Sequence, residues 1–416
     1  MHNTLLWGIS LVSIALMLIR PFGKSEVVWA GSGALLLILF RLIPLKLAGH
    51  AVAAGADVYF FLTGMMILSE LARFHGVFNW LASTAIRLAN GSRTRLFALL
   101  YCIGTVVTIF MSNDATAVVL TPAVLAAVKK SKVEPLPYLL ICALIANAAS
   151  FVLPISNPAN LVVFHTHMPR LSKWLGMFLI PSALSVAATY ISLRWYCRKD
   201  LGGRMEGEKE DEKLSPAGKL MLGGITLVAV VLLIASALDK DLGLPTFLTV
   251  AVVAVFVSLR EKTQPQEILG HISWSVLPLV AALFILVEAT ESVGALHWTT
   301  QALRAAQSTG QFAGSMGTSL AVGITANLLN NLPLGLIAGA TVQAAHNPEP
   351  LTNAVLLATD LGPNLSVTGS LATILWLIAI RREGLDVSFW SFLKVGLIVM
   401  PPALALATAA TIFSTK

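Results

Sequence analysis

Residues 360–370 read Asp-Leu-Gly-Pro-Asn-Leu-Ser-Val-Thr-Gly-Ser, and they interrupt an apolar run that extends from about residue 351 to about residue 380. Gly and Pro break helices, and Asn, Ser and Thr side chains carry hydrogen-bonding groups. A backbone that leaves its helix inside a bilayer is costly unless protein or a water-filled cavity surrounds it. The stretch therefore predicts a membrane helix that is broken at a polar site.

The composition also indicates a membrane protein. The chain has 416 residues, of which 56% are hydrophobic and 12% are charged. That charged fraction is about half that of an ordinary soluble domain, and many apolar runs reach the roughly 17–25 residues that cross a bilayer as a helix. A soluble globule and a disordered chain are excluded. The sequence predicts an all-α polytopic membrane protein.

The polar break at 360–370 has a counterpart in the first half of the chain. The apolar run that starts at residue 136 is broken at 153–160 by Leu-Pro-Ile-Ser-Asn-Pro-Ala-Asn, and Asn157 there corresponds to Ser370 in the second half. Broken helices that recur in the same order indicate a transporter built from a duplicated unit.

A second pair of interruptions predicts two hairpins. The stretches 112–116 (Ser-Asn-Asp-Ala-Thr) and 330–333 (Asn-Asn-Leu-Pro) each separate two apolar runs, and the separation of Asn113 from Asn330 is nearly that of Asn157 from Ser370. Lys and Arg flank the first pair of runs on both sides, and basic residues favour the cytoplasmic side. We therefore expect the first hairpin to enter the membrane from the cytoplasm and the second to enter from outside.

These features predict two inverted repeats, each with about five transmembrane helices plus a re-entrant hairpin. With both termini outside, 21 Lys and Arg face the cytoplasm and seven face outward, in agreement with the positive-inside rule. The predicted segments are a first repeat at 1–197 (hairpin about 94–131, broken span about 136–168), a cytoplasmic linker at 198–219, and a second repeat at 220–416 (hairpin about 311–346, broken span about 351–380).

Small amide and hydroxyl side chains occupy the hairpin tips and the breaks. They donate and accept hydrogen bonds, and the helix ends beside them add partial charges, so they suit a small neutral or anionic solute or Na⁺. The absence of Lys and Arg from this set favours a neutral substrate. The predicted substrate-binding residues are Ser112, Asn113, Thr116, Ser156, Asn157, Asn330, Asn331, Asn364, Thr368 and Ser370.

Two carboxylates, Asp114 and Asp360, stand within these interruptions. One interpretation is a capping role, in which the carboxylate accepts hydrogen bonds from free backbone N–H groups at a helix start. The other is proton coupling, because an ionisable group buried in a membrane is costly and is usually functional. We predict that both residues carry protons during transport.

Other kinds of function find no support in the chain. No G-x-x-x-x-G-K-[ST] stretch is present, so the chain itself is not expected to be an ATPase or another enzyme. The three cysteines show no disulfide or metal-binding spacing, and no basic domain points to nucleic acid. We expect no cofactor and no bound metal ion.

The interruptions are similar to those of a known family. The stretches 112–122, 155–157, 330–333 and above all 360–376 resemble the arsenical pump membrane protein (ArsB) family of the ion transporter superfamily. The resemblance implies export of arsenite and antimonite in exchange for protons, by alternating access, across the inner (plasma) membrane. It also implies that some members use a cytoplasmic ATPase as a partner.

One position departs from the family pattern. Members of the family place an Asp shortly before the first break, and this chain has Asn147 there, which leaves Asp114 and Asp360 as the proton carriers. Arsenous acid is an uncharged trihydroxy species, so a ring of amides and hydroxyls suits it. A Na⁺/H⁺ antiporter, a Na⁺-coupled carboxylate transporter and a passive channel for neutral solutes remain the alternatives.

Overall fold

The computed structural model describes residues 2–164, 168–205, 213–345 and 349–414. Residues 206–212 of the predicted linker lie outside this part of the chain. The described residues form α-helices, short 3₁₀ segments and one π-helical segment, and within them no strand occurs. The prediction of an all-α protein is confirmed.

The helices of the first half begin with an apolar pair and end with a helix of 26 residues. In chain order they are α1 (His2–Ile19), η1 (Pro21–Gly23), α2 (Glu26–Leu39), α3 (Leu45–Ala54), α4 (Ala56–Phe74), α5 (Val77–Ala89), α6 (Arg93–Met111), η2 (Ala115–Leu120), α7 (Thr121–Lys130), α8 (Leu136–Ala148), η3 (Pro154–Ser156), α9 (Pro158–Val163) and α10 (Leu171–Tyr196).

The second half has a similar succession of helices and again ends with one of 26 residues. In chain order they are α11 (Pro216–Ala237), α12 (Gly243–Glu261), α13 (Pro265–Leu269), α14 (Val276–Ser292), α15 (Ala295–Ser308), α16 (Gln311–Leu329), α17 (Asn331–Ala345), α18 (Glu349–Leu361), η4 (Gly362–Leu365), α19 (Leu371–Arg382) and α20 (Phe389–Ser414).

The stretch from α4 to the first hairpin tip recurs, with the same turns, from α14 to the second tip. Gly76 precedes α5 at φ 75°, and Gly294 precedes α15 at φ 94°. Ser112 follows α6 at φ 91°, and Asn330 follows α16 at φ 69°. The backbone thus pairs Ser112 with Asn330, one residue away from the pairing of Asn113 with Asn330 in the sequence.

Caps and prolines explain where several helices begin. The Ser92 hydroxyl accepts a hydrogen bond from the Arg95 N–H at 3.3 Å before α6, and Ser215 accepts one from the Gly218 N–H at 3.0 Å before α11. Pro216 then occupies the first turn of α11, where its missing N–H costs nothing. These local signals place the helix starts, and packing of apolar surface supplies the remaining stability.

Length and composition identify six helices of the described chain that can cross a membrane, or up to eight spans if two bent pairs each count as one. The six are α6, α10, α11, α12, α16 and α20, and the bent pairs are α3 with α4 and α14 with α15. Ten full spans were expected from the sequence. The number is smaller because α2 and α8 have only 14 and 13 residues and the breaks divide α8 from α9 and α18 from α19.

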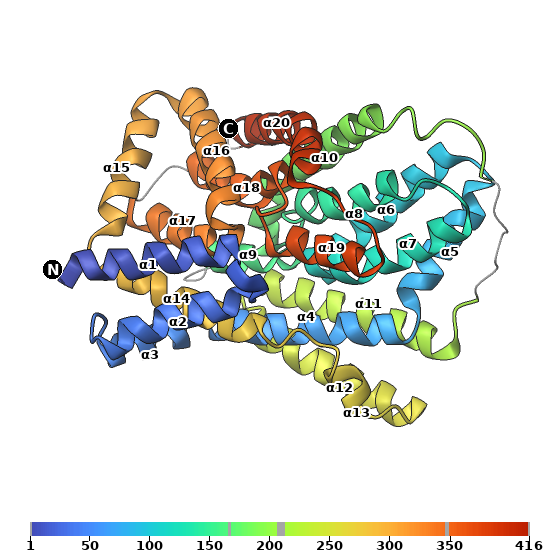
Figure 1. Ribbon diagram of the computed structural model, residues 1–416, viewed down its shortest axis with the longest axis horizontal. Helices are drawn as coiled ribbons and strands as arrows, with labels where there is room; N and C mark the ends of the chain where they lie inside the picture. The colour runs from blue at the N-terminus through green and yellow to red at the C-terminus, as the bar shows by residue number, and fades with distance from the viewer. Residues whose placement is uncertain (1, 165–167, 206–212, 346–348, 415–416) are drawn as a thin grey trace.

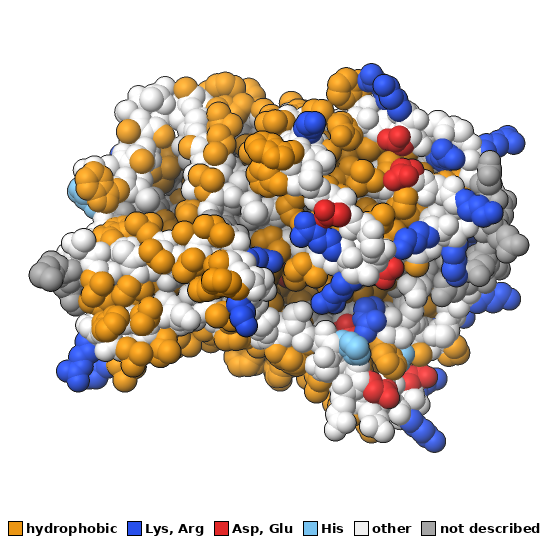
Figure 2. Space-filling view, in the orientation of Figure 1, with side chains coloured by type: hydrophobic (Ala, Val, Ile, Leu, Met, Phe, Trp, Pro, Cys, Tyr) orange, Lys and Arg blue, Asp and Glu red, His pale blue; other side chains and the backbone are white. Residues whose placement is uncertain are grey.

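The helices lie mostly along the longest axis of the molecule (Figure 1). The start of α1 and helix α15 lie at the left of this view, and α5 and α13 lie at the right. Figure 2 shows that Lys and Arg side chains gather toward the right-hand end of this face, whereas hydrophobic side chains cover much of its left part. Such a division is typical of a protein that crosses a bilayer.

Packing across the two halves is reciprocal. Helix α2 packs against α14, and α12, which follows α11 as α2 follows α1, packs against α4. The two final helices, α10 and α20, form the most extensive helix pair. The halves therefore interlock.

Candidate functional site

The two broken spans meet at Asp360, which lies on the last turn of α18 and is completely buried. Asn157, at the first break, donates a hydrogen bond through Nδ2 to Asp360 Oδ1 at 2.8 Å. Ser150, just after α8, lies with its hydroxyl 2.6 Å from Asp360 Oδ2. A carboxyl group of the second half is therefore held by two side chains of the first half. Capping does not explain Asp360, because both partners are side chains.

The Ser150 hydroxyl has two acceptors within reach but only one hydrogen. Its Oγ lies 2.7 Å from the carbonyl oxygen of Asn147 and 2.6 Å from Asp360 Oδ2. When Ser150 donates to the carbonyl, the short contact to Asp360 requires the carboxyl to be the donor, and hence protonated. When Asp360 is ionised, Ser150 donates to it instead. The geometry is thus compatible with both protonation states of Asp360.

A second contact joins the halves beside Asp360. Asn147 donates through Nδ2 to Asn364 Oδ1 at 3.0 Å, and Asn364 donates through its own Nδ2 to the Leu144 carbonyl at 3.0 Å. Both amides are completely buried. The number of residues that separates Asn147 from Asp360 equals the number that separates Asn157 from Ser370. The position that departs from the family pattern therefore belongs to the same polar cluster as Asp360.

Both breaks restart with a capped helix. Asn157 Oδ1 accepts a hydrogen bond from the Ala159 N–H at 3.0 Å at the start of α9. Ser370 Oγ accepts one from the Thr373 N–H at 3.1 Å at the start of α19. These helices begin deep in the protein, so the caps satisfy N–H groups that no water could reach.

The first hairpin tip borders a cavity. The tip residues Ser112 and Asp114 line it, and Asp114 makes no capping hydrogen bond. The cavity has a volume of about 80 Å³ and is partly open to solvent. Its other lining residues include Met65, Glu70, Pro158, His271, Val276 and Leu375. Asp114 therefore faces a space that a solute or a proton can enter.

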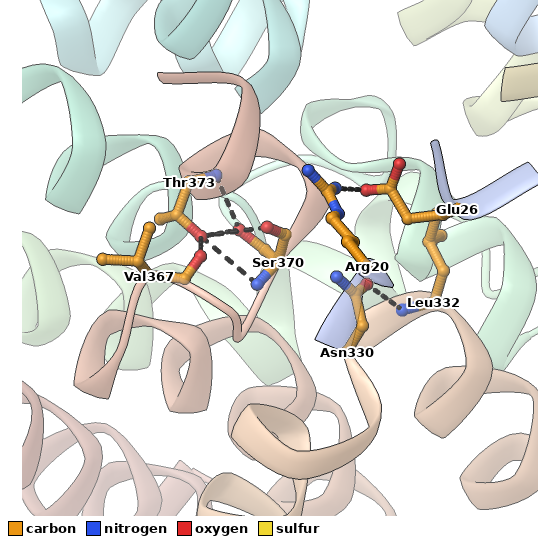
Figure 3. A network of polar contacts seen from close by, with 7 residues as sticks. All are labelled: Arg20, Glu26, Asn330, Leu332, Val367, Ser370 and Thr373. Carbon is orange, nitrogen blue, oxygen red and sulfur yellow. Dashed lines mark hydrogen bonds and ion pairs between the residues drawn. The ribbon is translucent and has the colours of Figure 1, made fainter. Parts of the chain in front are cut away.

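The second hairpin tip borders a much smaller cavity of about 10 Å³, with room for about one water molecule, which Asn330 and Leu332 line. The Asn331 N–H donates to the Gly369 carbonyl at 2.9 Å and ties this tip to the second break. Glu26 also lines this cavity and forms an ion pair with Arg20, a residue outside the predicted site. The chain turns back between α1 and α2 at this point, which brings Arg20 to the tip. Figure 3 draws this pair with the capped start of α19.

Three predicted site residues are engaged in local structure. The Thr116 hydroxyl lies 2.8 Å from that of Thr108 within the hairpin. Ser156 donates to the Ile109 carbonyl at 3.0 Å and ties the first break to α6, as Asn331 ties the second break to its hairpin. Thr368 donates to the Asn327 carbonyl at 3.1 Å. These hydroxyls hold the breaks in place.

The predicted site left out three polar residues of the cluster, one of which, Asn147, had been noted only as a departure from the family pattern. Asn147 and Ser150 hold the Asp360 region, and Asn327 accepts from the Ser366 N–H at 2.9 Å and donates to the Gly362 carbonyl at 2.8 Å. All three lie inside apolar runs or just at their ends, where a single amide or hydroxyl is easily taken for packing. Asn147 could have been found, because adding the repeat offset to its number gives Asp360.

Two buried amide oxygens at the hairpin tips have no hydrogen-bond donor among the described residues. They are Asn113 Oδ1 and Asn331 Oδ1, which occupy equivalent places one residue after the two positive-φ positions. An unpaired buried acceptor costs about 1–3 kcal/mol. Each tip therefore offers an oxygen to a hydroxyl donor or to a cation. Over the described residues, no cluster of three or more His, Cys, Asp or Glu could hold a metal ion.

Comparison with known proteins places the chain among transporters. A family model described as citrate transporter (CitMHS) matches residues 13–361. The arsenical pump membrane protein of Escherichia coli (strain K12) is 24% identical over 360 residues, and that of Yersinia enterocolitica is 25% identical over 360 residues. Each alignment covers 83% of this chain and 83% of the relative. The resemblance to the arsenical pump membrane protein family is confirmed.

A solved structure supports the fold. The YdaH transporter of Alcanivorax borkumensis, which was reported to have an unusual topology, superposes with a TM-score of 0.60 at 12% sequence identity. The match covers 99% of this chain and 98% of that one. With these similarities to proteins named as transporters and its membrane-spanning helices, the chain is a multi-pass membrane transporter that belongs to the CitMHS family.

Proposed function

We propose that the protein is a secondary active transporter that exports arsenite and antimonite from the cytoplasm in exchange for protons. The observation that carries this proposal is the completely buried carboxyl of Asp360, held by Ser150 and Asn157 where the two broken spans meet. A titratable group without a fixed cation suits the exchange of a proton for an uncharged solute. The similarity to arsenical pump membrane proteins supplies the substrate class.

The proposed cycle uses both carboxylates. Arsenous acid enters the first cavity from the cytoplasm and binds the tip amides and hydroxyls while Asp114 and Asp360 are ionised. The hairpins and broken spans then move as one unit, because Ser156 and Asn331 tie each tip to its break. Protons from outside displace the solute and reset the carrier. The two states need only differ in their affinities for solute and proton.

This cycle assumes the inverted-repeat arrangement that we propose, with the linker in the cytoplasm, both termini outside and the chain in the inner (plasma) membrane. The recurrence of helix lengths and the reciprocal packing of α2 on α14 and α12 on α4 support it. A separate cytoplasmic ATPase is a further proposed partner, because the sequence carries no phosphate-binding loop of its own.

The second candidate is a Na⁺/H⁺ antiporter or a Na⁺-coupled carboxylate transporter. The unpaired oxygens of Asn113 and Asn331 favour it, because Na⁺ prefers uncharged oxygen ligands of this kind, and the family model is described as citrate transporter. Arg20 is the cation nearest to the second tip, but Glu26 neutralises it. A carboxylate substrate therefore meets no Lys or Arg among the described residues that line the two tip cavities.

Everted membrane vesicles distinguish these functions. Arsenite uptake is measured while the proton gradient and the Na⁺ gradient are imposed separately, with vesicles from cells without the protein as the control. Arsenite accumulation that follows the proton gradient and ignores Na⁺ is expected. Citrate uptake or Na⁺-dependent transport that arsenite does not affect would establish the second candidate instead. Equilibration without accumulation would identify a passive channel.

We predict that Asp114→Asn abolishes proton-driven arsenite uptake while the protein stays folded. Asp114 lines the open cavity and makes no capping hydrogen bond, so an amide of the same size fits there without loss of a contact. Uptake in everted vesicles and size-exclusion profiles of the purified variant check both statements. Asp386→Asn, at an exposed loop position that pairs with Arg381, is the matched control. Full uptake by the Asp114 variant would remove this residue from coupling.

A variant without cysteines is expected to keep full transport. Trivalent arsenic binds thiolates, but Cys102 is exposed whereas Cys142 and Cys197 are buried at other places. Burial and the nearby Asp200 raise the pKa of the Cys197 thiol to about 12, so this thiol stays protonated at neutral pH. Arsenite resistance of cells that express the Cys→Ala triple variant at normal levels is the measurement. Loss of resistance would show that a thiol takes part.

A further inference from the structure

An isolated ion pair lies at the second hairpin tip. Arg20 begins the turn after α1, Glu26 begins α2, and Arg20 Nη2 contacts Glu26 Oε1. The two side chains are 22% and 15% exposed. Glu26 lines the same cavity as Asn330, and Figure 3 shows the pair in the region of Asn330 and Ser370. The α1–α2 turn thus brings two opposite charges beside the cavity at the second tip.

The two charges depend on each other. Arg20 Nη2 and Glu26 Oε1 are buried, and within the described chain neither atom has a hydrogen-bond partner apart from this ion-pair contact. The remaining lining of the cavity is apolar except for Asn330: Met17, Leu279, Leu283, Leu332, Pro333, Leu371 and Ile374. The charge that this cavity presents is therefore set by one pair.

The first tip is different at the equivalent position. Asp114 follows the positive-φ residue Ser112 by two places, and Leu332 follows the positive-φ residue Asn330 by two places. The second hairpin thus has an apolar side chain where the first has a carboxylate. At the second tip the carboxylate comes from Glu26, outside the hairpin, together with a cation. The first cavity is therefore lined by an acidic side chain of its hairpin, and the second is lined by a glutamate that pairs with Arg20.

The turn that carries Arg20 is strained. Arg20 has φ 49° and ψ 54°, and Phe22 has φ 59°, both in the left-handed region that residues with a Cβ rarely adopt. Such conformations are unfavourable and persist where the surrounding structure requires them. Here the strained backbone turns the chain so that the Arg20 side chain meets Glu26 at the cavity.

We propose that Glu26 is a specificity-determining residue, which masks Arg20 and thereby keeps the second tip closed to anions and open to uncharged solutes. Loss of its partner leaves a buried guanidinium unpaired, which destabilises the folded protein. The guanidinium then binds a carboxylate or phosphate oxygen that can reach it. The neutral pair instead leaves the Asn330 amide as the main polar contact for a solute. This inference rests on the proposed transport of an uncharged substrate through the same site.

The test removes the negative charge of Glu26 and supplies an anion that Arg20 can bind. Purified full-length Glu26→Gln is expected to gain thermal stabilisation by citrate, and its apparent affinity for citrate should exceed that of the wild type by about tenfold or more. Phosphate should act in the same way. Arsenite uptake by this variant should become sensitive to citrate. The double variant Arg20→Gln with Glu26→Gln has no charge to expose, so it should ignore citrate as the wild type does.

Each outcome decides the proposal. Equal citrate responses of the single and double variants, or no response of Glu26→Gln, would overturn it. If Glu26→Gln is unstable, citrate added during purification is expected to restore its monodisperse fraction. Citrate is not expected to restore Leu283→Ala, the control, which alters the same cavity without changing its charge. Failure of citrate to rescue Glu26→Gln, or equal rescue of both variants, also overturns the proposal. Citrate binding is measured without arsenite. A wild type that transports no arsenite would therefore refute the proposed function without deciding this point.

Discussion

Asp360→Asn is expected to abolish arsenite uptake driven by a proton gradient, with a loss on the order of 100-fold or more, the range found when a proton-transferring group is removed. Asn157 donates to one carboxyl oxygen and Ser150 lies 2.6 Å from the other. An amide at this position can accept from Asn157 and donate to Ser150, whose hydrogen then goes to the Asn147 carbonyl. The variant therefore reproduces the protonated form and cannot release the proton.

A carrier fixed in one protonation state loses coupling but need not lose movement. Exchange of labelled for unlabelled arsenite across the vesicle membrane should persist in Asp360→Asn, while net uptake against the gradient disappears. Asp57→Asn is the matched control: the Asp57 carboxylate accepts from the Gly243 N–H at 2.6 Å, and an amide keeps that acceptor. Proton-driven accumulation at the wild-type rate in Asp360→Asn would exclude this residue from coupling.

The positions of the breaks could be predicted because their residue types differ from those of the apolar runs around them. Pro, Gly and clustered amides are conspicuous within apolar runs, and the broken spans of the structure divide at the places that the sequence indicates. The pairing of residues across the breaks could not be predicted. Asp360 accepts a hydrogen bond from Asn157, which is 203 residues away, because the two halves of the chain pack against each other. No local pattern encodes that distance.

The charge of the site could not be predicted from sequence position. Arg20 stands at the end of the first apolar run, where a basic residue is ordinarily a topological signal. Its side chain meets Glu26 at the second tip only because the chain turns sharply at two positive-φ residues, neither of which is Gly. The register of the hairpins was predicted within one residue, because Asn113 and Asn330 look alike although the backbone pairs Asn330 with Ser112.

Gly362→Ala should have the largest effect on folding. A Cβ at Gly362 would lie 2.5 Å from both the Cα and the carbonyl oxygen of Gly323 and 2.9 Å from its carbonyl carbon. All three are backbone atoms of α16, so no side chain can rotate away. Overpacking of this kind costs about 1–3 kcal/mol or more. We expect a clearly lower melting temperature and a reduced monodisperse fraction in detergent.

The same variant should also impair transport in the protein that still folds. Separation of η4 from α16 stretches the hydrogen bond from Asn327 to the Gly362 carbonyl, now 2.8 Å, and moves Asn364 from its contact with Asn147. Gly317→Ala is the control, since Gly317 lies on the same helix with nothing within 4 Å of its added Cβ. That change should be neutral or stabilising by up to about 1 kcal/mol. Equal melting temperatures for the two variants would mean that the second hairpin and the second break are free to separate, and that they do not move as one unit during transport.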